Sequence, residues 1–245
     1  MNKKLHGSTV TAQKRAEGGI DEIGACAWQA GASEKSRRRY LAAEFVSLFI
    51  VTPLLYLRFR HLIHPIPLLW CVAALSTYLL YRDGYFSGNG FREARLRRKQ
   101  MIFLLERFVF IAAIIGLFTI LHDPGRFLSF PKTRTLLWLI VLFLYPILSV
   151  VPQGIVFRAF IFHRYGSLFG KGWGMIAVSG LTFSFAHLFY LNPVAALLTF
   201  AGGIMFAHTY LKSGSLWVSS MEHALYGDFI FTIGLGYYIY SGVVR

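Results

Sequence analysis

The stretch that decides the fold is PILSVVPQGIVFRAFIFHRY, residues 146–165. It begins as an apolar run of membrane length, and inside that run it places Pro152, Gln153, Arg158 and His163. An arginine at the centre of a membrane helix costs about 2.5–3.5 kcal/mol on insertion scales. This side chain must therefore face protein, water or the headgroup layer. The pattern indicates a membrane helix that turns a polar face towards other helices.

The composition points to the same class of protein. Hydrophobic residues make up 56% of the 245 residues, aromatic residues make up 17%, and the mean hydropathy is +0.53. A soluble domain is nearer about 45–50% apolar, and the excess here is concentrated in runs long enough to cross a bilayer. We therefore expect an all-α polytopic membrane protein, integral and multi-pass, with the lipid bilayer as its surroundings.

About seven transmembrane helices are expected, within a range of about six to eight. They fall near Tyr40–Leu57, Pro65–Tyr81, Met101–His122, Thr135–Tyr165, Met175–Leu191, Val194–Leu211 and Ser215–Tyr240. The fourth exceeds one bilayer crossing, and Pro152 is expected to break or kink it. Polar residues gather in the fourth, fifth and seventh spans, so we place a polar site among those three.

The chain divides into three regions by composition. Residues 1–39 are polar and basic without sustained periodicity, and we expect a disordered cytoplasmic tail. Residues 40–134 hold three N-terminal spans and their loops, and residues 135–245 hold a helical membrane core. Arg37–Arg39 and the basic loop Arg82–Gln100 both place the N-terminus in the cytoplasm by the positive-inside rule.

The net charge of +14 does not indicate nucleic-acid binding. Many lysines and arginines lie in the tail and in loops beside apolar runs, where the positive-inside rule expects them. Glu106 and Arg107 fall one turn inside the third span. We expect these two side chains to snorkel to the cytoplasmic face, with pairing to another helix as the alternative.

Three predicted helices carry polar groups at helical spacing. In the fourth span, Gly154 and Arg158 are four residues apart and share a face, with Gln153 on its shoulder. The same spacing occurs in the fifth and seventh spans, in Phe183–His187 and His223–Gly227.

The order and spacing of these groups resemble the CPBP family of intramembrane endopeptidases. That family includes the type II CAAX-prenyl endopeptidases and bacteriocin-processing homologues, and its signature is EExxxR, then FxxxH, then HxxxN or HxxxD. The matching stretches are QGIVFR (153–158), FSFAH (183–187) and HALYG (223–227). The resemblance covers roughly residues 135–235, so the region 135–245 is taken as a CPBP-like core. It implies a protein of the bacterial cytoplasmic (inner) membrane.

The resemblance also implies an activity and roles for particular residues. The chain would be an endopeptidase that activates a water molecule to cleave a membrane-associated protein or peptide. His187 would be the water-activating histidine, His223 the oxyanion donor, and Arg158 the residue that orders the site. Gln153 would position the water.

Three departures from the signature bear on that activity. Gln153 and Gly154 stand in place of the two glutamates, and Gly227 stands in place of the asparagine. Glutamine holds water by hydrogen bonds but does not accept a proton at ordinary pH. Glycine offers no side chain, so Arg158 loses its expected partner. These losses favour the alternative of a non-catalytic homologue that binds a peptide, a lipid or a partner protein. A small transporter or channel ranks third.

Only two carboxylates follow residue 135, Glu222 and Asp228. Either is a candidate for a relocated base, or for a third metal ligand beside His187 and His223. Both zinc and no metal stay open as cofactor predictions. Glu222 adjoins His223, so on a regular helix the two side chains point about 100° apart. A hydrogen-bonded role for Glu222 is an equal alternative to catalysis.

Overall fold

A computed structural model describes residues 33–86 and 98–239, and the regular elements in those ranges are all helical. The chain divides into two units, Met1–Glu44 and Phe45–Arg245. Residues 33–39 are helical, which corrects the predicted disorder at the end of the tail. Glu34 and Arg38 lie four residues apart, and an acidic and a basic side chain at this spacing favour a helix. The rest of the tail and residues 87–97 of the basic loop lie outside the described residues.

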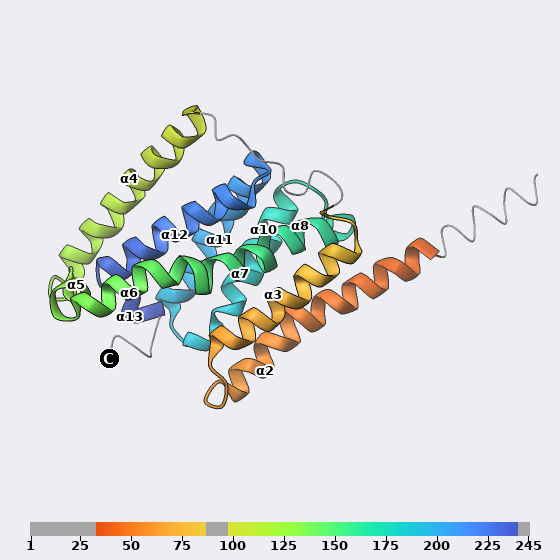
Figure 1. Cartoon of the computed structure of the whole chain (residues 1–245), viewed down its shortest axis with the longest axis horizontal. Coiled ribbons are helices and arrows are strands. Elements are labelled where there is room, and N and C mark those ends of the chain that lie inside the picture. The colour runs from red at the N-terminus through yellow and green to blue at the C-terminus, as the bar shows by residue number, and fades with distance from the viewer. Residues whose placement is uncertain (1–32, 87–97, 240–245) are drawn as a thin grey trace, which may run out of the picture. The chain divides into compact units, whose positions relative to one another are not determined.

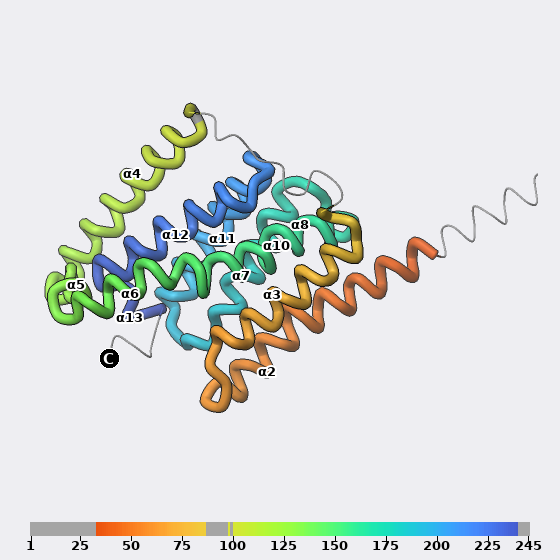
Figure 2. The backbone as a smooth tube through the Cα atoms, viewed as in Figure 1, coloured from red at the N-terminus to blue at the C-terminus, as the bar shows by residue number. Residues whose placement is uncertain are grey.

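The second unit is a bundle of helices (Figures 1 and 2). In chain order its elements are η1 (Ser47–Val51), α2 (Thr52–Phe59), α3 (Pro65–Arg82), α4 (Arg98–His122), α5 (Ser129–Thr133), α6 (Thr135–Tyr145), η3 (Pro146–Val150), α7 (Val151–Gly154), η4 (Ile155–Phe160), α8 (Ile161–Arg164), α9 (Gly166–Phe169), α10 (Trp173–Ala186), η5 (Leu188–Tyr190), α11 (Pro193–Ser213), α12 (Leu216–Thr232) and α13 (Gly236–Ile239).

Among the described residues, five helices are long and apolar enough to cross a membrane. They are Ser33–Phe59, Gln100–His122, Thr135–Arg164, Trp173–Tyr190 and Pro193–Ser213. The expectation of an all-α polytopic membrane protein is confirmed. Two of the seven predicted spans, those of α3 and α12, fall outside this group, so the count of seven stays a prediction.

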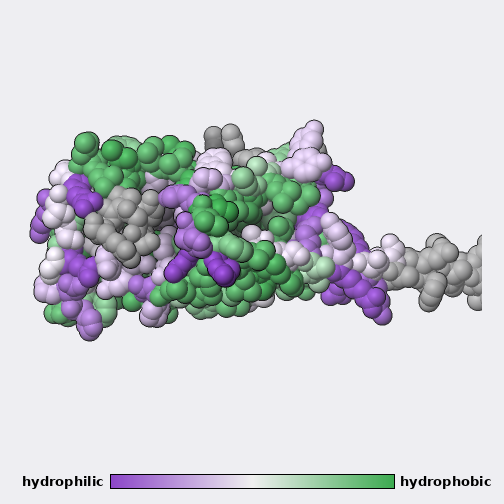
Figure 3. Space-filling model, turned by 90° about the horizontal axis from the view of Figure 1, so that it is seen from below, coloured by the Kyte–Doolittle hydropathy of each residue, from purple (hydrophilic) through white to green (hydrophobic). Residues whose placement is uncertain are grey.

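The exterior is apolar over wide areas. Figure 3 shows a face on which hydrophobic side chains form broad patches and hydrophilic ones gather in smaller groups. In Gln100–His122, which lies within α4, only 6% of the most apolar 18-residue stretch is buried inside the protein. In Pro193–Ser213, which is α11, the corresponding share is 39%. Helix α4 is therefore peripheral and α11 is central. Apolar side chains on a peripheral helix suit contact with lipid.

The segment that decides the fold lies in one continuous helix of 30 residues, Thr135–Arg164, drawn in green in Figure 1. At about 1.5 Å per residue it is roughly 45 Å long, longer than the ~30 Å hydrocarbon layer. The break considered for Pro152 does not occur. Instead the π-helical turns η3 and η4 flank the short α7 that contains this proline, and such turns absorb local departures from α-helical bonding.

A tryptophan from α3 donates a hydrogen bond to a backbone carbonyl one turn before Pro152. In an α-helix the carbonyl of Leu148 would accept from the N–H of residue 152, and proline has none. The Trp70 Nε1–H donates to that carbonyl at 3.0 Å. Backbone groups inside a membrane must find partners within the protein, so this bond both satisfies Leu148 and fixes α3 against the long helix.

Helices α10 and α11 approach most closely at two glycines. A Cβ built on Gly203 would lie 2.9 Å from the Gly180 Cα, and a Cβ on Gly180 would lie 2.6 Å from the Ile204 Cδ1. Small residues at a crossing let two membrane helices pack backbone to backbone. This contact sets α10 and α11 side by side around the site.

Candidate functional site

The ring of Phe183 in α10 is the centre around which the predicted site residues gather. The Arg158 guanidinium carbon lies 4.9 Å from the centroid of this ring. The ring centroids of His187 and His223 lie 4.6 and 5.4 Å from it. Arg158 comes from η4, His187 follows α10, and His223 comes from α12. The three segments that the sequence placed together therefore meet in the structure.

Arg158 is buried without a hydrogen-bond acceptor. It is 1% exposed, and its Nε, Nη1 and Nη2 atoms have no hydrogen-bond partner among the described residues. Its neighbours are aromatic, because the ring of Phe206 lies 5.1 Å from the guanidinium carbon in addition to Phe183. Cation–π contacts of this kind contribute about 0.5–2 kcal/mol. A buried charge with no ion partner remains costly.

Helix α12 fills the space beside Gly154, where the family signature has its second glutamate. A Cβ at Gly154 would lie 2.7 Å from the Ser220 Oγ and 3.3 Å from the Leu216 Cδ1. The glycine therefore allows close packing of α7 against α12, and a larger side chain would need Ser220 and Leu216 to move. Arg158 interacts electrostatically with Glu222 and Tyr145, but it bonds neither.

His187 is held in a single orientation at the end of α10. Its Nδ1 lies 2.7 Å from the backbone carbonyl oxygen of Phe183. A carbonyl only accepts, so Nδ1 carries the hydrogen and donates. In the neutral ring Nε2 is then the unprotonated nitrogen, which is the form that accepts a proton or a water hydrogen.

Gln153 lies where the signature has its first glutamate. Its Nε2 donates to the Ser149 Oγ at 2.7 Å. Its Oε1 is buried and has no hydrogen-bond partner among the described residues. An amide oxygen of this kind accepts a hydrogen bond from water but takes no proton.

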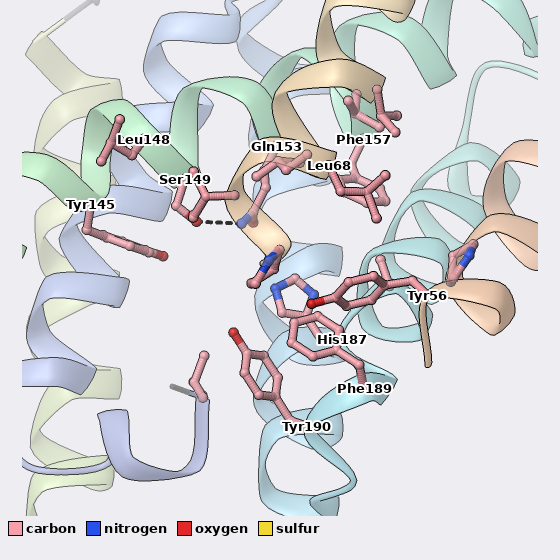
Figure 4. A pocket seen from close by; sticks show the side chains of 18 of the residues that line it. Tyr56, Leu68, Tyr145, Leu148, Ser149, Gln153, Phe157, His187, Phe189 and Tyr190 are labelled. Atoms are coloured by element: carbon pink, nitrogen blue, oxygen red, sulfur yellow. Dashed lines mark hydrogen bonds between the residues drawn. The ribbon is translucent and has the colours of Figure 1, made fainter. Parts of the chain in front are cut away.

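His187 and Gln153 both line an apolar cavity of about 380 Å³. Residues of α2, α3, α6 and η5 complete its walls, and its other polar groups are Thr52, Tyr56, Tyr145, Ser149 and Tyr190. Figure 4 shows His187 in the middle of this cavity, with Ser149 and Gln153 on one side and Tyr190 on another. No carboxylate, lysine or arginine of the described residues lines it. Arg158, His223 and Glu222 are also absent from its walls.

His223 lies behind Tyr145. Its Nε2 is 3.1 Å from the Tyr145 hydroxyl, and its ring stacks on Phe206 with centroids 4.6 Å apart. The other ring nitrogen, Nδ1, is buried with no hydrogen-bond partner among the described residues. Tyr145 lines the cavity and His223 does not, so the tyrosine is the group that connects His223 to the cavity.

Glu222 is engaged on a different face of α12. It forms an ion pair with Arg107 of α4, and its side chain is only 2% exposed. The Arg107 Nη2 also donates to the Thr209 Oγ1 at 2.8 Å. The expectation that Arg107 snorkels is therefore wrong for this side chain, because a buried carboxylate lies within its reach. Glu222 and His223 point in different directions, as the angle of about 100° between adjacent helical positions requires.

Comparison with known families matches this part of the chain. Residues 133–227 match the family model of the type II CAAX prenyl endopeptidase Rce1-like proteins. The match includes the three motif stretches and ends at Gly227, the last position of the third. This match supports membership of the CPBP family. No curated protein and no solved structure matches the chain. Together with the apolar helices, the match supports, at the family level, an integral membrane protein of the CAAX-protease type.

The residues present do not fit the zinc site considered for this protein. Among the described residues, no group of three His, Cys, Asp or Glu side chains lies close enough to hold a metal ion. The candidate ligands have other partners: His187 bonds a carbonyl, His223 bonds Tyr145, and Glu222 pairs with Arg107. A structural or catalytic zinc needs at least three protein ligands. No step proposed below runs through a metal.

Sequence reasoning missed Tyr145 and Phe206, and it favoured the wrong surroundings for Arg107. Tyr145 belongs to an apolar run and has no motif of its own, but the glycine at 227 was a usable signal. A missing side chain inside a packed CPBP site leaves a space that another residue must fill. Arg107 was noticed and given the wrong surroundings. Phe206 carried no signal, since one phenylalanine among 23 in the chain is not distinguished by type.

Proposed function

We propose that the chain is an intramembrane endopeptidase that cleaves a membrane-associated protein or peptide, with His187 as the base that activates water. The observation that carries this proposal is the orientation of His187. Its Nδ1 is fixed by the Phe183 carbonyl, and the ring lines a cavity inside the helical bundle. The nitrogen left for chemistry is therefore the basic Nε2.

The reaction uses this nitrogen twice. His187 Nε2 accepts a proton from a water molecule as the water oxygen adds to the peptide carbonyl carbon. The same proton then passes from Nε2 to the amide nitrogen as the C–N bond breaks. A histidine that moves protons in this way contributes about 10²–10⁴-fold to rate, and an apolar cavity strengthens each polar interaction within it.

Gln153 holds the water in this scheme. Its Oε1 has no protein partner among the described residues, and it comes from the helix that forms one wall of the cavity. An amide oxygen orients a water by accepting one of its hydrogens, while the second hydrogen goes to His187. This arrangement replaces the positioning role of a glutamate without replacing its basicity, so we expect slow turnover.

Arg158, His223 and Glu222 act from behind the cavity wall. Arg158 contacts Phe183, whose carbonyl fixes His187. His223 contacts the same ring and bonds Tyr145. We assign Arg158 and His223 as positioning residues. Glu222 holds α4 to α12 through Arg107.

The second candidate function is a non-catalytic homologue that binds a peptide, a lipid or a partner protein. It is favoured by the cavity wall, which among the described residues carries no carboxylate. It is also favoured by Gly154, because Ser220 lies where a side chain at this position would begin. In this reading the cavity binds an apolar ligand and nothing is hydrolysed.

Proteolysis by the purified protein in liposomes separates the two functions. The probes are a farnesylated CAAX peptide, its unprenylated counterpart and a proteome-derived peptide mixture, with products identified by mass spectrometry. His187→Ala should lower kcat by about 10²-fold or more. His61→Ala, which changes an exposed loop histidine, is the matched control. Equal cutting by His187→Ala and the parent would rule out the proposed mechanism.

A single substitution restores a carboxylate without disturbing the packing. Gln153→Glu has nearly the shape of the native side chain, whereas a glutamate at 154 would collide with α12. The endopeptidase proposal expects Gln153→Glu to raise an activity that the parent already has. Activity found only in Gln153→Glu would instead identify the parent as a non-catalytic homologue.

A further inference from the structure

The place where the family signature has an asparagine side chain is occupied in this chain by a tyrosine from another helix. Gly227 has no side chain, and a Cβ built on it would coincide with the ring and hydroxyl of Tyr145. Tyr145 ends α6, and its residue number lies 82 before Gly227. The glycine and the tyrosine are therefore a matched pair, because a side chain at 227 and the observed position of Tyr145 exclude each other.

The hydrogen bond between Tyr145 and His223 has a preferred direction. The two atoms, the tyrosine hydroxyl oxygen and His223 Nε2, are 3.1 Å apart, and His223 Nδ1 is buried without a partner. If the hydroxyl donated, the hydrogen of a neutral ring would sit on the unpartnered Nδ1. Buried N–H groups without acceptors are rarer than buried acceptors without donors. The favoured arrangement has His223 donating from Nε2, which leaves the Tyr145 hydrogen available.

That hydroxyl is directed into the cavity. Tyr145 is one of the lining residues, together with His187 and Gln153. Figure 4 shows the Tyr145 oxygen pointing into the space shared with His187 and Tyr190. A peptide carbonyl attacked by water at His187 would develop its negative charge within this space, where only a few polar groups lie among apolar walls.

We propose that the Tyr145 hydroxyl is the donor that stabilises the oxyanion of the reaction, and that His223 positions it. The inference rests on the proposed endopeptidase function. As water adds to the carbonyl carbon, the electron pair of the C=O bond moves to oxygen, and the Tyr145 O–H donates a hydrogen bond to it. No proton leaves the tyrosine. When the C–N bond breaks, the pair returns to re-form C=O, and the amine nitrogen takes its proton from His187.

The first test is Tyr145→Phe, measured in liposomes with the peptides described above. The phenyl ring still fills the space over Gly227, but His223 loses its hydrogen-bond partner, so the thermal midpoint should fall modestly without loss of the fold. Loss of one oxyanion donor should lower kcat by ~10²–10³-fold while KM stays near the parent value. Tyr85→Phe is the matched control, since it removes a hydroxyl that bonds Tyr210 outside the cavity. Unchanged kcat in Tyr145→Phe overturns the inference.

The second test moves the donor back to the position in the family signature. Tyr145→Ala opens the space, and Gly227→Asn in the same chain supplies an amide N–H there. The double variant should turn over faster than Tyr145→Ala alone. Gly227→Asn by itself should lower the thermal midpoint, because the tyrosine ring occupies the asparagine's space. A double variant no faster than Tyr145→Ala counts against a donor role at this place.

The outcomes separate this inference from the function on which it rests. If His187→Ala is inactive and Tyr145→Phe cuts as fast as the parent, the endopeptidase proposal stands and the oxyanion role of Tyr145 fails. If His187→Ala cuts as well as the parent, or if the parent cuts none of the peptides, both fail. If the two variants lose kcat together while Tyr85→Phe keeps it, both are supported.

Discussion

Arg107 and Arg158 both carry a positive charge into the helical bundle, but their surroundings differ. Arg107 meets a carboxylate and a hydroxyl, from Glu222 and Thr209. Arg158 meets two aromatic rings and no hydrogen-bond acceptor among the described residues. The first arrangement is what a charge needs inside a membrane protein for stability. Arg158 has no such partner among the described residues, and it lies next to the cavity. The comparison indicates that Arg107 is kept for stability and Arg158 for the site.

Breaking the Arg107–Glu222 ion pair should have the largest effect on stability. Arg107→Met leaves the Glu222 carboxylate buried and unpaired, which costs about 3–5 kcal/mol of unfolding free energy. Reversible unfolding in mixed micelles measures it. The control is Glu222→Gln in the Arg107→Met chain, which removes the stranded charge and should recover part of the loss. Equal stability of Arg107→Met and the parent would show that the pair contributes nothing.

Removing the unpaired charge of Arg158 should raise stability. Arg158→Met replaces a buried cation with no ion partner by an apolar side chain of similar length. We expect the unfolding free energy to rise by roughly 1–4 kcal/mol, the range found when buried charged groups are replaced by apolar ones. Turnover should fall in the same variant. A loss of stability would mean that Arg158 does have a strong partner, and the contrast with Arg107 would disappear.

The smallest expected effect on stability comes from removing the hydroxyl that Arg107 contacts. Thr209→Val keeps the shape of the side chain and removes the hydroxyl that accepts from Arg107. One hydrogen bond to a charged group contributes about 1.5–3 kcal/mol, but the guanidinium keeps its bond to Glu222, so about 1 kcal/mol is expected. The same unfolding experiment measures it. A loss as large as that of Arg107→Met would make the hydroxyl, and not the ion pair, the main partner.

The meeting of three distant segments was within reach of the sequence. Three of the long hydrophobic runs contain a polar residue, namely Arg158, His187 and His223. Polar side chains in membrane helices almost always face the interior of the bundle, so these three were expected to lie close together. The spacing of four residues assigned each group to a face of its helix. The helix face of each polar group, and the order of the motifs along the chain, were enough to predict that the three helices meet.

What lay beyond the sequence was the identity of each neighbour. Spacing along one helix says which side chains point the same way and nothing about what another helix brings there. Arg107 was therefore expected to snorkel although Glu222 lies within reach, and Tyr145 was not considered beside Gly227. Pro152 was expected to break or kink its helix, but π-helical turns and the Trp70 bond satisfy the backbone around it.

The bond from Trp70 to the Leu148 carbonyl has a consequence for how the cavity admits an occupant. It crosses from α3 to the long helix at the edge of the cavity, whose wall on that side includes Leu69 and Leu148. Parting these two helices would strip an indole and a carbonyl of their hydrogen bond in a medium without water to replace it. Separation of α3 from the long helix is therefore an unfavourable way to enlarge the cavity for a bulky occupant.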